Sequence, residues 1–203
     1  MLTPYKDRFR AVPESAARLF LKFGLSPNGI TVLGLVMGWL TCLFFVWNRN
    51  PVLFGILLIF WGLFDAVDGA AARITGRVTK FGSYLDALCD RLFEAGAVLA
   101  GAYVTGYWVL SYLVLTGTLL VSYAKARAAM EVSVTNTEWP DFMERTERDI
   151  IYAVGLILWG FLPHVLFWGK DLFFWTLAGL NVALYFTFVQ RFLRARRIIE
   201  SRA

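Results

Sequence analysis

Four aspartates fall within or beside long apolar segments of this 203-residue chain: Asp65, Asp68, Asp86 and Asp90. A carboxylate is costly inside a membrane helix, so acids in such segments indicate a functional site. The spacings i, i+3 and i, i+4 put each pair on one face of its helix. Four carboxylates cannot stay ionised together at low dielectric unless cations compensate them. Since oxygen ligands favour hard ions, the acids predict a site for Mg²⁺ or Mn²⁺, with two ions expected.

The segments that carry these acids are long enough to cross a membrane. Hydrophobic residues make up 58% of the chain and the mean hydropathy is +0.58, which excludes an ordinary soluble domain. A spanning helix needs about 20 predominantly apolar residues. Six stretches meet this requirement, and they cover residues 29–47, 52–73, 83–104, 107–130, 149–167 and 172–193. The sequence therefore predicts an all-α integral membrane protein with six transmembrane helices in one domain, residues 26–203.

Residues 1–25 differ from the rest because basic and apolar side chains are interleaved. This pattern predicts an amphipathic helix over residues 3–24 that lies on the membrane surface. The basic members of the pattern are Lys6, Arg8, Arg10, Arg18 and Lys22.

Basic residues are distributed unequally between the two sides of the predicted bundle. Of the 20 Lys and Arg residues, all but Arg49 and Lys170 fall on the side that holds the aspartates and both termini. The positive-inside rule places that side in the cytoplasm. We therefore expect a multi-pass protein of the cell (inner) membrane with a cytoplasmic active site. The net charge of +5 suits anionic lipid or a phosphorylated substrate rather than nucleic acid, because no basic run outside the spans is interleaved with aromatics.

The aspartates belong to a longer motif, D-x2-D-G-x2-A-R-x8-G-x3-D-x3-D. This motif resembles the signature of the CDP-alcohol phosphotransferases. The resemblance implies that an acceptor hydroxyl attacks the β-phosphorus of a CDP-linked lipid and that CMP leaves. It implies that Asp65, Asp68 and Asp86 bind the metals, and that Asp90 is the general base and also touches the second metal. The fixed positions are filled by Asp65, Asp68, Gly69, Ala72, Arg73, Gly82, Asp86 and Asp90.

The same resemblance implies a set of residues that contact the CDP-lipid donor. They come from the motif, from its flank and from the stretch Ser-Pro-Asn-Gly-Ile-Thr upstream. A homodimer is also expected from the family alone. The donor residues are Asn28, Thr31, Gly69, Ala72, Arg73, Thr79 and Gly82.

A second group of residues bears on the acceptor. Lys125 ends one predicted helix, Arg145 and Arg148 open the next, and Arg191 ends the last. Basic groups that converge from three helices suit an anionic acceptor, because Arg makes bidentate contacts with phosphate and Lys provides a point charge. The elements S-Y-x-K-A-R-A, E-R-x-E-R and Q-R resemble those of the phosphatidylinositol-phosphate and archaetidylinositol-phosphate synthases. That resemblance implies that Lys125, Arg148 and Arg191 hold the phosphate of inositol phosphate, with Arg145 as a further candidate.

Several alternatives remain at this point. Glycerol 3-phosphate as acceptor would make the chain a phosphatidylglycerol-phosphate synthase, and a CDP-inositol donor would give a di-inositol phosphate product. The basic residues could instead anchor anionic lipids. A divalent-cation transporter would use the aspartates as an ion path, but it would need polar groups that continue through the membrane, and spans 52–73 and 83–104 are largely apolar beyond their acidic ends.

Overall fold

The computed structural model describes residues 11–132 and 142–202, and most of them are helical. The other regular element in this part of the chain is a two-residue antiparallel hairpin, β1 (Leu166–Phe167) with β2 (Lys170–Asp171). The helices are α2 (Ala11–Lys22), α3 (Pro27–Asn48), α4 (Pro51–Ile74), α5 (Lys80–Thr105), α6 (Trp108–Glu131), α7 (Arg145–Phe161) and α8 (Leu172–Arg202).

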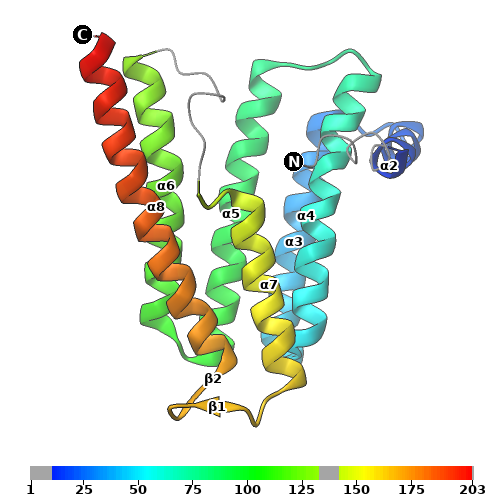
Figure 1. Cartoon of the computed structure of the whole chain (residues 1–203). Coiled ribbons are helices and arrows are strands. Elements are labelled where there is room, and N and C mark those ends of the chain that lie inside the picture. The colour runs from blue at the N-terminus through cyan, green and yellow to red at the C-terminus, as the bar shows by residue number, and fades with distance from the viewer. Residues whose placement is uncertain (1–10, 133–141, 203) are drawn as a thin grey trace.

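Helices α3 to α8 run along a common axis and form one bundle, as Figure 1 shows. The hairpin lies at one end of the bundle, and the C-terminus lies at the other end together with the connection between α4 and α5. Helix α2 lies across this axis. Its buried Ala17 packs with Ile30 of α3 and with Val67, Ala70 and Ala71 of α4. The predicted surface helix is thus present over Ala11–Lys22, while residues 1–10 lie outside the described residues.

Within the described residues, four helices have the length and apolar composition of membrane spans: α3, α4, α6 and α8. The chain is therefore an all-helical, multi-pass membrane protein, but the six predicted spans are matched by only four helices of this kind. Helix α5 has 26 residues, which is long enough to span, and it carries the charges of Asp86, Asp90, Arg91 and Glu94 in its first half. Helix α7 has 17 residues and ends at Phe161, six residues before the predicted end of its span.

Proline explains the early end of α7. Pro163 lacks an N–H group, and its ring disfavours helical geometry at Leu162. The chain then turns back through Trp168 and Gly169, which both have positive φ (50° and 72°). The apolar run that continues to residue 167 therefore ends in the hairpin, where Phe167 and Trp168 are exposed.

Side-chain caps fix the helix ends near the acids. The Ser26 hydroxyl accepts a hydrogen bond from the backbone N–H of Gly29 (3.1 Å) at the start of α3, and Thr79 accepts one from Gly82 (2.9 Å) at the start of α5. Glu144 and Glu147 form a capping box at the start of α7. Each cap satisfies N–H groups that the first helical turn leaves unpaired. These caps set where the first turns of α3, α5 and α7 begin.

The core of the bundle lies between the acids and the hairpin. The rings of Phe45 in α3 and Phe54 in α4 stack at 4.1 Å, and buried Leu156, Phe173 and Leu177 belong to the same cluster. Close approach between α3 and α5 depends on Gly38, since a Cβ there would lie 2.7 Å from the Phe93 ring. In α4 and α5 the acidic segments give way to apolar residues toward the hairpin. The described parts of these two helices do not continue the polar path that a cation transporter would need.

Candidate active site

Three of the four predicted metal ligands converge. Asp65 and Asp68 lie near the C-terminal end of α4, and Asp86 lies in the second turn of α5. The short connection between these antiparallel helices brings the two segments together. One carboxylate oxygen from each of the three residues lies within 4.8 Å of the others. Each side chain is half-buried, so water alone compensates these charges poorly.

The surroundings of these acids fit a cation. The Thr31 hydroxyl of α3 donates a hydrogen bond to Asp68 Oδ2 at 2.6 Å. Oδ1 of Asp86 is buried and finds no hydrogen-bond partner among the described residues. A buried carboxylate oxygen without a donor is unfavourable unless a cation binds it. The all-oxygen donor set therefore fits Mg²⁺ or Mn²⁺, with Asp65, Asp68 and Asp86 as the residues that would hold it.

Asp90 lines the same cavity as the other three acids. Its carboxylate does not belong to the three-residue cluster. Instead, Asp90 Oδ2 accepts a hydrogen bond from Nη1 of Arg145, which comes from α7. The same Nη1 lies 3.3 Å from Asp65 Oδ2. The structure thus brings the predicted quartet together around one cavity, with an arginine inserted between two of its members.

All seven predicted donor residues line a single open cavity. Asp68 and Asp86 also line it, so it adjoins the acid cluster. The wall is tight at Gly82, where a Cβ would lie 3.1 Å from Thr79 Oγ1 and 3.2 Å from Asn28 Oδ1. Arg77 lines the cavity as well, and the sequence analysis missed it. Its position just beyond the end of α4, four residues after Arg73, was the available signal. The seven residues are Asn28, Thr31, Gly69, Ala72, Arg73, Thr79 and Gly82.

The predicted acceptor residues line another open cavity, on the α7 side of the acids. It is strongly basic. Its lining consists of Lys125, Arg145, Arg148 and Arg191, which were predicted, and of Arg91, Ser122 and Ala126, which were not.

Two of these arginines are buried and contact other groups of the protein. The side chain of Arg148 is only 5% exposed; its Nη1 donates to the Met143 carbonyl at 3.4 Å, and its Nη2 lies 3.7 Å from Glu94 Oε1. Arg191, which is 6% exposed, donates to the Val121 carbonyl. A buried guanidinium needs such partners, and they fix its direction.

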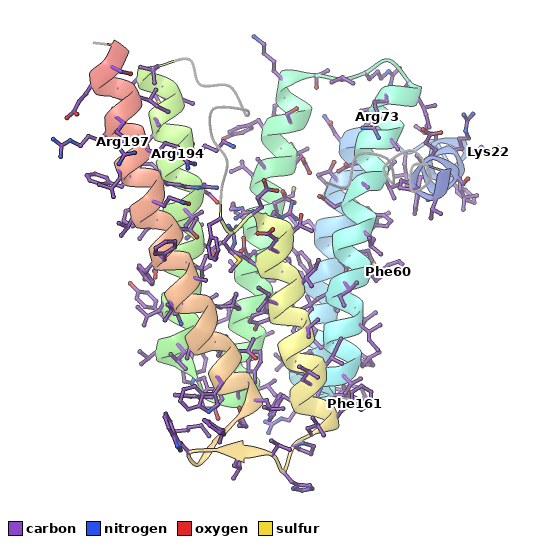
Figure 2. The ribbon with its side chains drawn as sticks, viewed as in Figure 1. Lys22, Phe60, Arg73, Phe161, Arg194 and Arg197 are labelled. Carbon is purple, nitrogen blue, oxygen red and sulfur yellow. The ribbon has the colours of Figure 1, made fainter. Side chains whose placement is uncertain are left out.

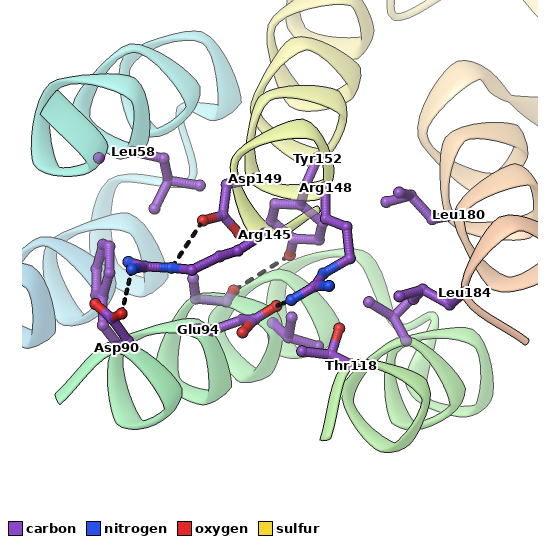
Figure 3. A pocket seen from close by; sticks show the side chains of 15 residues that line it. Leu58, Asp90, Glu94, Thr118, Arg145, Arg148, Asp149, Tyr152, Leu180 and Leu184 are labelled. Carbon is purple, nitrogen blue, oxygen red and sulfur yellow. Dashed lines mark hydrogen bonds and ion pairs between the residues drawn. The ribbon is translucent and has the colours of Figure 1, made fainter. Parts of the chain in front are cut away.

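Glu94 is a buried acid that the sequence analysis did not single out. Its side chain is 10% exposed and pairs with both Arg148 and Arg91, whose Nη1 lies 2.6 Å from Glu94 Oε2. Arg91 also donates to the Ser122 hydroxyl at 3.1 Å. Figure 3 shows Glu94 and Arg148 beside the pair of Arg145 and Asp90. The i, i+4 spacing of Glu94 from Asp90 on α5 was the signal that could have revealed it.

The three cavities are contiguous through shared residues. The acid cavity shares Thr31, Asp68 and Asp86 with the donor cavity, and it shares Arg145 with the basic cavity. A phosphate-rich donor on one side and an anionic acceptor on the other would therefore meet at the acids.

Comparisons with known proteins identify the family of the chain. A model of the CDP-alcohol phosphatidyltransferase family matches residues 24–189. The archaetidylinositol phosphate synthase of Pyrococcus horikoshii is 32% identical over 202 residues, which cover 98% of this chain and 99% of that protein. The crystal structure of phosphatidylinositol phosphate synthase from Mycobacterium tuberculosis with CDP-DAG bound has a TM-score of 0.80 at 28% identity and covers 91% of this chain and 94% of that chain. The crystal structure of that synthase with manganese and citrate has a TM-score of 0.79 at 28% identity and covers 90% and 88%. The motif, the site and these matches together establish that the chain belongs to the CDP-alcohol phosphatidyltransferase family.

Proposed function

We propose that this chain transfers the phosphatidyl-type group of a CDP-linked lipid to a phosphorylated polyol, specifically inositol phosphate, and releases CMP. The observation that carries this proposal is the position of the acids between a cavity lined by the family's donor residues and a cavity lined by five basic side chains. Similar proteins named archaetidylinositol phosphate synthase and phosphatidylinositol phosphate synthase support the choice of acceptor.

On the donor side, Arg73 and Arg77 line the cavity and would contact the phosphates of the donor, and Asn28 and Thr79 lie where α3 meets the start of α5. Guanidinium groups bind phosphate oxygens through paired hydrogen bonds. Gly69 and Gly82 keep the floor of the cavity free of side chains, so the donor can approach the backbone. Mg²⁺ or Mn²⁺ bound at the acid cluster would offset the charge of the pyrophosphate and stabilise the charge that develops on the departing CMP.

On the acceptor side, Asp90 is placed to take the proton from the attacking hydroxyl. The new bond forms between that oxygen and the β-phosphorus, while the bond from the β-phosphorus to the bridging oxygen breaks and its electron pair leaves with CMP. Lys125, Arg148 and Arg191 hold the phosphate of the acceptor away from the reacting centre. Glu94 keeps Arg148 pointed into the basic cavity.

The membrane setting completes the proposal. Lys22, Arg73, Arg194 and Arg197 lie toward the end of the bundle opposite the hairpin (Figure 2), and we place that end, with both termini and the active site, in the cytoplasm. The N-terminal region, residues 1–25, would then rest on the inner leaflet while residues 26–203 form the catalytic membrane domain. A lipid donor could keep its tails in the bilayer and still meet a soluble acceptor. We also propose a homodimer, on family resemblance.

An acceptor panel tests the proposed function. Purified protein is given CDP-diacylglycerol or CDP-archaeol together with inositol phosphate, glycerol 3-phosphate or inositol, and CMP release is measured. We expect inositol phosphate to be preferred over inositol, because the basic cavity suits an acceptor that carries a phosphate. We expect it to be preferred over glycerol 3-phosphate because of the similarity to archaetidylinositol phosphate and phosphatidylinositol phosphate synthases. Preference for glycerol 3-phosphate would identify a phosphatidylglycerol-phosphate synthase instead. A parallel reaction replaces the CDP-lipid with CDP-inositol and keeps inositol phosphate as acceptor; turnover in that reaction alone would identify a di-inositol phosphate synthase. Either result contradicts the proposal.

Replacing Lys125 by alanine should weaken acceptor binding selectively. Loss of one charged contact to phosphate should raise the KM for inositol phosphate by about tenfold or more, with little change in the KM for the CDP-lipid. Arg127→Ala is the matched control, since Arg127 lies two residues further along α6, is exposed and pairs with Glu131 at 2.6 Å. Equal effects of Lys125→Ala on both KM values would argue for a scaffold role.

A further inference from the structure

Arg145 lies at the boundary between the acid cavity and the basic cavity and lines both. Its guanidinium is engaged at two ends. Nη1 contacts the carboxylates of Asp65 and Asp90, and Nε lies 3.4 Å from Asp149 Oδ2, one turn further along α7. Figure 3 shows this side chain extended between Asp90 and Asp149. With 27% of the side chain exposed, these pairs are only partly screened by water.

This position conflicts with the roles proposed for the acids. Asp65 Oδ2 and Asp90 Oδ2 both face Nη1 of Arg145. Each carboxylate keeps its Oδ1, but a guanidinium at Oδ2 repels a metal ion from that oxygen and makes the carboxylate a weaker base toward a substrate proton. One positive group therefore stands between two carboxylates that the reaction needs.

We infer that Arg145 occupies a cation position of the acid quartet in the metal-free protein and exchanges with a divalent metal. The inference rests on the proposed function, which requires Asp65 and Asp90 to be available. When the metal binds, Nη1 leaves Asp65 and Asp90, and the side chain turns about its contact with Asp149 into the basic cavity that it already lines. There it meets the acceptor phosphate.

The exchange couples the two sites. A metal that releases Arg145 adds a guanidinium to the acceptor cavity, and an acceptor phosphate that holds Arg145 frees two carboxylates for the metal. Coupling between two binding sites is reciprocal, so each ligand should tighten the other by the same factor. Arg148 cannot substitute for Arg145 in this respect, because Glu94 and the Met143 carbonyl hold it in the basic cavity.

Mn²⁺ binding tests the inference without reference to turnover. Full-length protein in detergent, with no CDP-lipid, is titrated with Mn²⁺ by calorimetry or by the electron paramagnetic resonance signal of the free ion. Arg145→Gln should bind Mn²⁺ about tenfold more tightly than the unmodified protein. Arg145→Gln should also melt at a lower Tm in chelator, and saturating Mn²⁺ should abolish that difference. A purely structural salt bridge would lower the Tm equally in both conditions, which would overturn the inference.

Arg148→Gln is the matched control, because it removes the same charge from the same helix one turn away. It should leave the affinity for Mn²⁺ nearly unchanged and weaken the binding of inositol phosphate. If it raises the affinity for Mn²⁺ as much as Arg145→Gln does, the effect comes from the removal of any nearby positive charge, and the inference fails. Unchanged Mn²⁺ affinity in Arg145→Gln also overturns it.

The reciprocal coupling provides the second measurement. Saturating inositol phosphate should tighten Mn²⁺ binding several-fold in the unmodified protein. Arg145→Lys keeps the charge and the fold but cannot contact Asp149 and Asp90 at once, so the coupling should disappear; coupling of full size in that variant would overturn the inference. Mn²⁺ binding in the absence of acceptor does not depend on which acceptor the enzyme uses. Failure of the acceptor panel and failure of the exchange are therefore distinguishable.

Discussion

Asp90→Asn should lose turnover while it still binds nucleotide. The substitution keeps the shape of the side chain and removes its capacity to take a proton. General-base catalysis typically contributes about 10²- to 10⁴-fold, so kcat for CMP release should fall by that factor. The donor cavity does not include Asp90, and CDP binding measured by calorimetry should therefore change little.

Asp171→Asn is the control for this substitution. It makes the same chemical change at the hairpin end, where Asp171 Oδ2 accepts a hydrogen bond from Tyr107 at 2.7 Å and Oδ1 accepts one from the backbone N–H of Phe174 at 2.8 Å. The single oxygen of an asparagine can keep one of the two. The control substitution should leave kcat unchanged and report only on insertion and folding. An Asp90→Asn protein that turns over within a fewfold of the unmodified rate would remove the general-base role.

The positions of the helices could be predicted from the sequence because each follows a long apolar run between polar breaks. The end of α7 could not, since Leu166, Phe167 and Trp168 continue the apolar run and look like further helix. Pro163 was the local signal against it, and the hairpin depends on backbone turns at Trp168 and Gly169 that hydropathy does not detect. Helix α5 shows the opposite case: it is long enough to span, but the charged residues of the site lower the hydropathy of its first half.

The acidic and donor parts of the site could also be predicted, because they come from one short motif in two helices joined by a short turn. Spacing within a helix determines which side chains share a face, and the α4–α5 turn brings the two faces together. The seven donor residues accordingly line one cavity.

The roles of Arg145 and Arg148 could not be separated from the sequence. Three residues apart, they differ by only about 60° around the helix axis, so both can face α5. Tertiary contacts determine which arginine reaches which acid. Arg145 pairs with Asp90, and Arg148 pairs with Glu94, one turn further along α5. The chain before α7 has no periodic pattern that would fix its register against α5.

Removing divalent metal should abolish activity altogether. In excess chelator, CMP release should fall to background, and Mg²⁺ or Mn²⁺ should restore it, because the charge of the pyrophosphate would otherwise meet three converging carboxylates. Equal rates of CMP release with and without chelator would contradict the metal assignment. Binding itself is visible in the thermal stability of the protein: a ligand at 100 times its Kd stabilises the folded state by about 2.7 kcal/mol, so Mn²⁺ should raise the Tm.

Asp86→Asn separates metal binding from a general effect on folding. Asp86 contributes a carboxylate to the cluster and has one buried oxygen with no hydrogen-bond partner in the described residues. Without metal, the substitution removes a like charge from Asp65 and Asp68, so the Tm in chelator should rise or stay the same. With metal it removes a ligand, so the Mn²⁺-dependent rise in Tm should be lost along with turnover. An acid with a purely structural role would show the opposite pattern: its replacement would lower the Tm in chelator and leave the Mn²⁺-dependent rise in Tm intact.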